Sequence, residues 1–218
     1  MIGKAITKNS IMLGIFAVVV AASLAATELY TRDLREAAIR KVKSKALEEV
    51  VSPKLRDNVL LDSAITVDDQ KYLKLKDPAS IYVARKNGDI TAFIIPTRAP
   101  DGYGGAINTI VGVNLNGDIT GVRVITHKET PGLGDKVETK KSDWVYEFNG
   151  RSLTNPEADG WAVKKDRGIY DQFTGATITP RAVVGSVHNA LLFYKANKSE
   201  LLKKAQLSVD ADQTPAES

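Results

Sequence analysis

Nineteen consecutive residues without a charged side chain, residues 9–27, constrain this chain more than any other feature. At about 1.5 Å per helical residue they span roughly 28 Å, which is close to the hydrocarbon thickness of a bilayer. Lys4 and Lys8 precede the run, and no acidic residue does, which favours a cytoplasmic amino terminus. We therefore expect a cytoplasmic end over residues 1–9 and a transmembrane helix over residues 10–27. The remainder then lies outside the inner membrane, in the periplasm of a Gram-negative cell.

A cleaved signal peptide is the alternative reading of the same segment. The triplet Ser-Leu-Ala at 23–25 resembles a small-x-small cleavage site. Against cleavage, residues 28–51 contain no proline or glycine and are rich in Ala, Leu, Glu, Lys and Arg. This composition predicts a membrane-proximal helix over 28–52, ended by Ser52-Pro53, whose last apolar residues dock on the following domain.

Composition excludes several functions for the rest of the chain. With no cysteine and two histidines among 218 residues, disulfides, thiolate metal sites and multi-histidine metal centres are not expected. The net charge is +4, and the lysine pairs are dispersed instead of forming a basic stripe with aromatic residues. We therefore expect no metal centre and no nucleic-acid binding.

Two segments, 81–97 and 110–126, share the phrase NGDIT between apolar runs. Asn-Gly flanked by apolar residues predicts a β-hairpin with a type I′ turn. The second hairpin alternates apolar and polar residues, which predicts a half-buried ribbon, whereas the first is more continuously apolar and more central. The chain is therefore expected to adopt an α+β fold of twisted antiparallel hairpins packed with helices, on a single N-terminal transmembrane helix.

Shorter elements are expected in the second half. Residues 138–148 look helical and residues 160–165 look like a strand. Apolar residues recur at helical spacing after Pro180, with Thr179 as the N-cap. This helix is expected to run to about residue 205, with a break near Asn197. The domain is thus assigned to residues 53–205 and a disordered, polar tail to 206–218.

The segment DQFTGATIT, residues 171–179, places two threonines around Gly-Ala. A turn that uses the conformational freedom of glycine accounts for this pattern without further chemistry. The alternative is that one threonine hydroxyl is presented for modification.

The same segment resembles the D-x-x-(S/T)-G-A-T flavinylation motif of the FMN-binding domain family. This domain occurs in the G-type component of the Rnf/Rsx electron-transport complex and in the C-type component of the sodium-pumping NADH:quinone reductase. The match is complete, and GYGG (102–105) and HKETPGLG (127–134) accompany it in the family's order. The chain length favours the Rnf protein, because the quinone-reductase chains are expected to be longer. The matching motif residues are Asp171, Thr174, Gly175, Ala176 and Thr177.

The resemblance implies that Thr177 is esterified to the phosphate of FMN. A separate flavin transferase, using FAD and a divalent metal, would make this phosphoester and recognise Asp171. Because a helix begins just beyond, the phosphate oxygens are expected to contact backbone amides of residues 177–182.

The other loops are expected to hold the flavin ring without covalent bonds. Thr130 and the amides near Gly132 and Leu133 are candidates for the polar edge of the ring, and the Leu133 side chain for its face. Tyr103 and Trp144 are candidates for stacking on the ring. His127 is expected to be structural or a residue at the rim of the site, since no further ligands make a metal site with Glu129.

The resemblance also implies an electron-carrying subunit of a membrane-bound, ion-translocating ferredoxin:NAD oxidoreductase-type complex, or of one that reduces a redox-sensing regulator. Its expected partners are other integral-membrane subunits, including a second flavin carrier, together with lipid. No catalytic residues and no stand-alone activity are expected. The alternatives are a non-redox assembly or sensor subunit, in which TGAT is only a turn, and a free-standing flavoprotein reductase.

Overall fold

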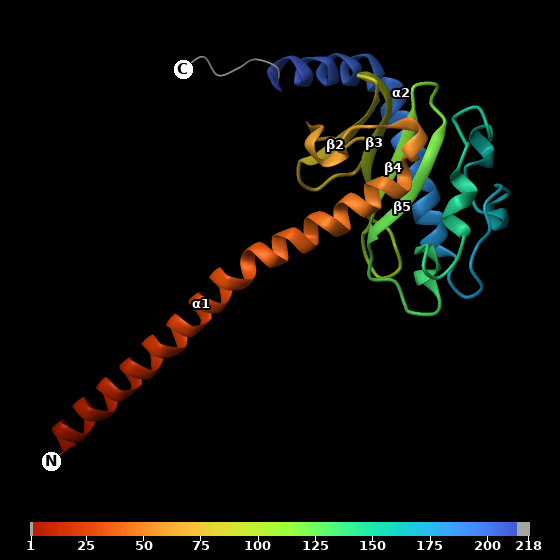
Figure 1. Cartoon of the computed structure of the whole chain (residues 1–218). Helices are drawn as coiled ribbons and strands as arrows, with labels where there is room; N and C mark the ends of the chain where they lie inside the picture. Colours follow the sequence, from red (N-terminus) through yellow and green to blue (C-terminus); the bar gives the residue numbers. More distant parts are fainter. Residues whose placement is uncertain (1, 213–218) are drawn as a thin grey trace. The chain divides into compact units, whose positions relative to one another are not determined.

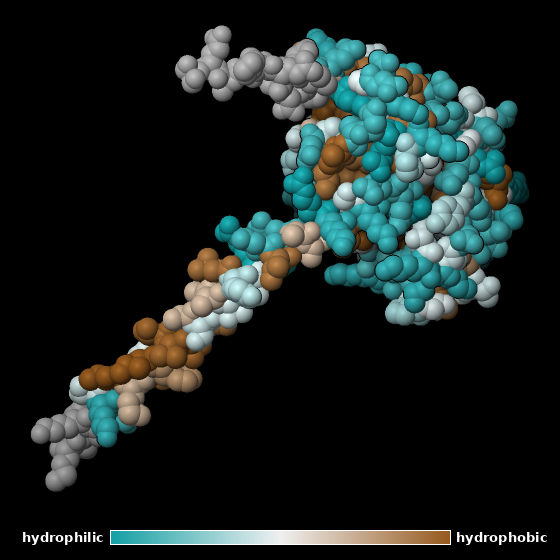
Figure 2. Space-filling view, viewed as in Figure 1, coloured by the Kyte–Doolittle hydropathy of each residue, from teal (hydrophilic) through white to brown (hydrophobic). Residues whose placement is uncertain are grey.

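The computed structural model describes residues 2–212, which divide into two compact units after Lys43 (Figure 1). The helix α1, Ile2–Val50, begins in the first unit, where the side chains of residues 6–43 are all exposed. Figure 2 shows the hydrophobic side chains gathered along this helix. Within the described residues, α1 alone is long and apolar enough to cross a membrane. The predicted transmembrane segment is therefore helical, and its apolar surface is available to lipid.

The second unit is built on a five-stranded antiparallel sheet with the strand order β1-β2-β3-β4-β5. The two predicted hairpins are β2–β3 and β4–β5, and the pairing of β3 with β4 joins them. The first hairpin supplies the central strand β3, as its apolar sequence predicts. The strands are β1 (Ala64–Val67), β2 (Ala79–Lys86), β3 (Asp89–Ala99), β4 (Ile107–Asn114) and β5 (Ile119–Thr126).

The two NGDIT turns differ in conformation. Asn87 and Gly88 both have positive φ, at 54° and 88°, as a type I′ turn requires. At the second turn only Gly117 has a positive φ, so the type I′ prediction is wrong there. The Asn114 side chain accepts hydrogen bonds from the amides of Asn116 and Asp118, and this local cap favours a longer turn.

The two faces of the sheet pack against different helices. Alternate residues of β2 and β3, such as Ile81, Val83 and Phe93, face the helix α2, which Figure 1 shows crossing the sheet. The intervening residues, such as Tyr82 and Ile94, belong to a second cluster, which the end of α1 completes. The central strands are therefore buried on both sides, which explains their continuous apolar sequence.

The end of α1 docks on the sheet as predicted. Leu47, Val50 and Val51 are fully buried in the second cluster, and the Thr120 hydroxyl donates a 2.9 Å hydrogen bond to the Val50 carbonyl. These three residues cover the outer face of the sheet, so the prediction of a half-buried second hairpin is wrong. The strand β4 is buried over most of its length.

Irregular segments account for two wrong predictions. Residues 138–148 do not form one helix, because only Trp144–Phe148 is helical there, as a short 3₁₀ turn. Residues 160–165 form no strand, and Val163 makes a single bridge to Tyr170. Both segments are held by buried aromatic side chains instead of ladder hydrogen bonds. The 3₁₀ helices are η1 (Pro53–Leu55), η2 (Leu60–Asp62), η3 (Gly134–Val137), η4 (Trp144–Phe148), η5 (Ala158–Gly160) and η6 (Lys164–Asp166).

The helix α2, Ile178–Asp212, begins two residues earlier than predicted. The Arg181 amide donates to the Thr177 carbonyl at 3.3 Å, so Thr177 occupies the N-cap position that the sequence predicts for Thr179. The helix is continuous past Asn197 and past residue 205, which corrects the predicted break and places residues 206–212 in the helix. The rest of the predicted tail, 213–218, lies outside the described residues.

Candidate functional site

The TGAT segment folds as a turn followed directly by the start of α2. The Ala176 amide donates to the Phe173 carbonyl at 3.0 Å, and Gly175 has a φ of 79°. Positive φ at the third residue is typical of a type II turn and favours glycine there. The turn ends at Ala176, so it accounts for the glycine but leaves Thr177 outside, half-buried at the N-cap of α2.

Thr177 lines a cleft of about 630 Å³, a volume within the usual range for small-molecule sites. Three segments that are far apart in the sequence meet there: the GYGG loop, the ETPGLG loop and the TGAT turn with the first turn of α2. Of the predicted ring-binding residues, Tyr103, Thr130 and Leu133 line the cleft. Tyr103 is 70% exposed and Leu133 is 42% exposed, so both have apolar surface to offer a ligand.

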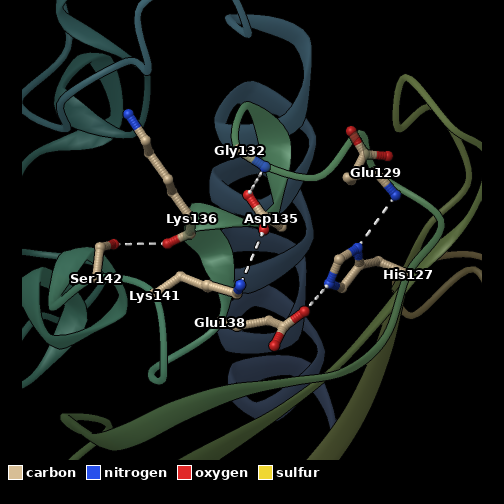
Figure 3. Close-up of polar contacts among 8 residues, drawn as sticks. All are labelled: His127, Glu129, Gly132, Asp135, Lys136, Glu138, Lys141 and Ser142. Carbon is tan, nitrogen blue, oxygen red and sulfur yellow. Dashed lines mark hydrogen bonds and ion pairs between the residues drawn. The ribbon is translucent and has the colours of Figure 1, made fainter.

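The ETPGLG loop is held by local hydrogen bonds, and Figure 3 shows the one between Gly132 and Asp135. The Gly132 amide donates to the buried Asp135 carboxylate at 2.8 Å. The amides of Leu133 and Gly134 both donate to the Thr130 carbonyl at 3.1 Å. The amides of Gly132 and Leu133 are therefore already engaged, which argues against the predicted bonds from them to a ring edge.

Trp144 does not line the cleft. It is 6% exposed, packs edge-on against Phe173 with ring centroids 5.1 Å apart, and donates from Nε1 to the Asp171 carbonyl at 2.8 Å. The structure thus places Trp144 behind the motif, where it supports the backbone of the turn instead of stacking on a ligand.

The other polar motif residues face solvent. Thr174 is exposed on the turn and does not line the cleft. Asp171 is also exposed and forms an ion pair with Lys164 at 2.5 Å, and this contact raises the pKa of the Lys164 ammonium group. Both residues are accessible to another protein.

Two charged residues of the cleft were not predicted. Lys165, which the sequence suggests is ordinary solvated surface, lines the cleft and lies in the loop that the parallel bridge between Val163 and Tyr170 closes. Glu129 is a buried carboxylate that accepts a hydrogen bond from the buried Thr179 hydroxyl. Its position within HKETPGLG is the one sequence signal that pointed to it. His127 is structural as expected, since its Nε2 contacts Glu138 at 2.8 Å and its Nδ1 accepts from the Glu129 amide.

Two protein-family models match this chain and define its class of protein. Residues 102–192 match the FMN-binding domain family, and this range contains the cleft, both glycine-rich loops and Thr177. Residues 1–50 match the RnfG N-terminal region. The chain is therefore a membrane-anchored protein with an FMN-binding domain.

Similar proteins then define the family. The chain is 47% identical over 199 residues to the G-type component of the ion-translocating oxidoreductase complex of Pseudomonas aeruginosa strain UCBPP-PA14, covering 91% of this chain and 93% of that protein. It is 42% identical over 209 residues to the protein of the same name from Shewanella piezotolerans, covering 96% and 98%. The Vibrio cholerae protein is 43% identical over 197 residues, covering 90% and 94%. The chain belongs to this family of G-type components of ion-translocating oxidoreductase complexes, which confirms the resemblance inferred from its motifs.

The residues of the cleft fit FMN. Tyr103 and Leu133 provide apolar surface for a flat ring, and Lys165 provides a positive charge. The amides of Ile178 and Thr179 lie in the first turn of α2 and have no carbonyl partner within the helix, so they favour an anion. Pro180 carries no amide proton and adds nothing to this group.

Proposed function

We propose that this chain is the electron-carrying subunit of an ion-translocating oxidoreductase complex and that it carries FMN bound covalently through a phosphoester to Thr177. The position of Thr177 is the observation that carries this proposal. It lines the cleft at the N-cap of α2, whereas Thr174, the other hydroxyl residue of TGAT, faces solvent. The first-turn amides and Lys165 are then near the place where a phosphate on Thr177 would sit.

The attachment needs a second enzyme. The Thr177 hydroxyl loses its proton and forms the new bond to phosphorus, while the phosphoanhydride of the donor FAD breaks and AMP leaves. A threonine hydroxyl is a weak nucleophile, and no base is bonded to Thr177 among the described residues, so a flavin transferase must activate it. The exposed Asp171 and Thr174 offer that enzyme an accessible surface.

Once attached, FMN supplies the capacity to accept and release electrons. The chain's own residues would hold and shield it: Tyr103 and Leu133 would offer apolar surface to the ring, and Lys165 and the amides of α2 would balance the phosphate charge. We assign no proton-transferring residue, and activity is expected only within the assembled complex.

We further propose that the amino terminus is cytoplasmic and the FMN-binding domain periplasmic. Lys4 and Lys8 before the apolar run support this orientation. The relatives are named as subunits of an ion-translocating oxidoreductase complex, which supports partner subunits for this chain. We propose that these partners are integral-membrane subunits, one of them a second flavin carrier, and that the complex serves electron exchange of the ferredoxin:NAD type or reduces a regulator. Protease digestion of intact spheroplasts checks the orientation, because a periplasmic domain is cut and a cytoplasmic one is protected.

Peptide mass spectrometry tests the attachment. The full chain is produced with and without a flavin transferase and digested. Co-production is expected to add the mass of FMN minus water to the peptide that contains Thr177, and production alone is not. An unmodified chain after co-production contradicts the proposal and favours the assembly or sensor subunit. Electron transfer by the isolated chain with a soluble donor favours the free-standing reductase.

A further inference from the structure

Glu129 is a buried carboxylate for which the proposed function has no role. It is 5% exposed and lines the cleft. Its backbone amide donates to His127 Nδ1 at 3.1 Å, and Figure 3 shows its carboxylate pointing away from that ring. The backbone is therefore fixed on one side, and the side chain reaches toward other segments.

The carboxylate binds two separate segments of the chain. One oxygen accepts from the Gly104 amide at 2.9 Å, and the other accepts from the Thr179 hydroxyl. Both carboxylate oxygens are thus used as acceptors. In the part of the chain that the structure describes, no ion pair includes Glu129, so these two donors are its polar partners.

Two glycines leave room for this side chain. A methyl group on Gly102 would lie 2.9 Å from one carboxylate oxygen, and one on Gly134 would lie 3.0 Å from the other. Larger residues at either position would collide with the carboxylate. The GYGG loop, the ETPGLG loop and α2 thus meet around one charged group.

We infer that Glu129 is a positioning residue, which fixes the GYGG loop and the first turn of α2 relative to each other at one cleft and gives that cleft a fixed negative charge. Tyr103 precedes Gly104, whose amide binds Glu129, and Thr177 lies two residues before Thr179, so the carboxylate sets their separation. The effect of the charge on a flavin rests on the proposed function. A nearby negative charge disfavours adding electrons, so its removal raises the reduction potential.

Hydrogen exchange tests the positioning role in the full chain in detergent, without flavin. Glu129→Ala is expected to accelerate exchange tenfold or more in residues 102–105 and in the first turn of α2, because both lose their acceptor. Exchange in β3 is expected to stay unchanged. Glu129→Gln should restore part of the protection, since its amide oxygen still accepts one bond. If Glu129→Ala accelerates exchange throughout the domain, the exchange of Glu129→Gln in the two segments decides whether the carboxylate positions them. Wild-type exchange rates in the two segments of both variants overturn the inference.

Redox titration of the flavin-loaded chain tests the charge. Glu129→Gln is expected to raise the midpoint potential of the attached FMN, whereas the control Asp101→Asn, which removes an exposed charge in the neighbouring segment, should leave it unchanged. Equal potentials in Glu129→Gln and the wild type contradict the charge effect. If the wild-type chain acquires no flavin, the proposed function fails, while hydrogen exchange still decides the positioning role.

Discussion

The sheet and the connection over residues 127–177 are held together by different forces. In the sheet, ladder hydrogen bonds pair every strand, and the central strands bury apolar residues on both faces. The regular secondary structure of the connection consists only of short 3₁₀ helices and isolated bridges, and packed aromatic side chains hold the segment in place. Those rings are Trp144, Phe148, Trp161, Tyr170 and Phe173. The sheet therefore supplies the regular strand pairing, whereas the connection positions Thr177 and most of the residues that line the cleft, although both regions share one hydrophobic core.

The largest expected effect separates chemistry from stability. Thr177→Ala is expected to abolish FMN attachment completely, since no oxygen remains to form the ester, and the fold is expected to survive the loss of one N-cap residue. Peptide mass spectrometry after co-production with the transferase measures this loss. Thr177→Ser and Thr174→Ala serve as controls that keep the hydroxyl at 177. Flavin retained on Thr177→Ala, for example on Thr179, contradicts the assignment.

A substitution in the sheet is expected to lower stability and to leave flavin attachment to the folded protein intact. Phe93 is fully buried and contacts Tyr194 of α2, with ring centroids 6.0 Å apart. Phe93→Ala is expected to lower the free energy of unfolding by about 3–5 kcal/mol through the cavity that it leaves. Denaturant unfolding followed by circular dichroism measures this change, with the 60% exposed Val59 changed to alanine as control. If folded Phe93→Ala protein no longer accepts flavin, the sheet also positions the attachment site, which contradicts the distinction between the two regions.

A pair of tryptophan variants isolates one hydrogen bond in the connection. Trp144 donates to the Asp171 carbonyl, whereas the buried Nε1 of Trp161 has no hydrogen-bond partner among the described residues. Trp144→Phe should therefore lower the unfolding free energy by about 1 kcal/mol more than Trp161→Phe, and should slow flavin attachment. Equal effects of the two substitutions would mean that this bond does not hold the motif.

The smallest expected effect concerns pH. His188 of α2 stacks on Trp161, and burial lowers the pKa of its imidazole below the ordinary value of 6.5. The unfolded chain thus binds a proton more readily, so stability is expected to fall as the pH drops below about 6.5. His188→Phe should flatten this part of the dependence of unfolding free energy on pH. An unchanged acid slope in that variant assigns the dependence to other groups.

The elements that the sequence predicts well depend on neighbouring residues. The apolar run of α1 and the two Asn-Gly hairpins follow from patterns within about twenty residues, because lipid burial and strand pairing repeat at fixed spacing. The sequence predicts the N-cap of α2 two residues too late, because Thr177 and Thr179 are equally good caps in composition. In the structure the Thr177 carbonyl accepts from the Arg181 amide, whereas the Thr179 hydroxyl binds Glu129, fifty residues away.

The sequence by itself determined the anchor, the antiparallel α+β fold and the segment that contains the proposed flavin acceptor, because each of these depends on contiguous residues. The tertiary structure alone decided which side chains surround Thr177. It brought Lys165 and Glu129 to the cleft and moved Trp144 behind the motif. These positions depend on packing between segments far apart in the chain, and such packing has no local period for a sequence to display.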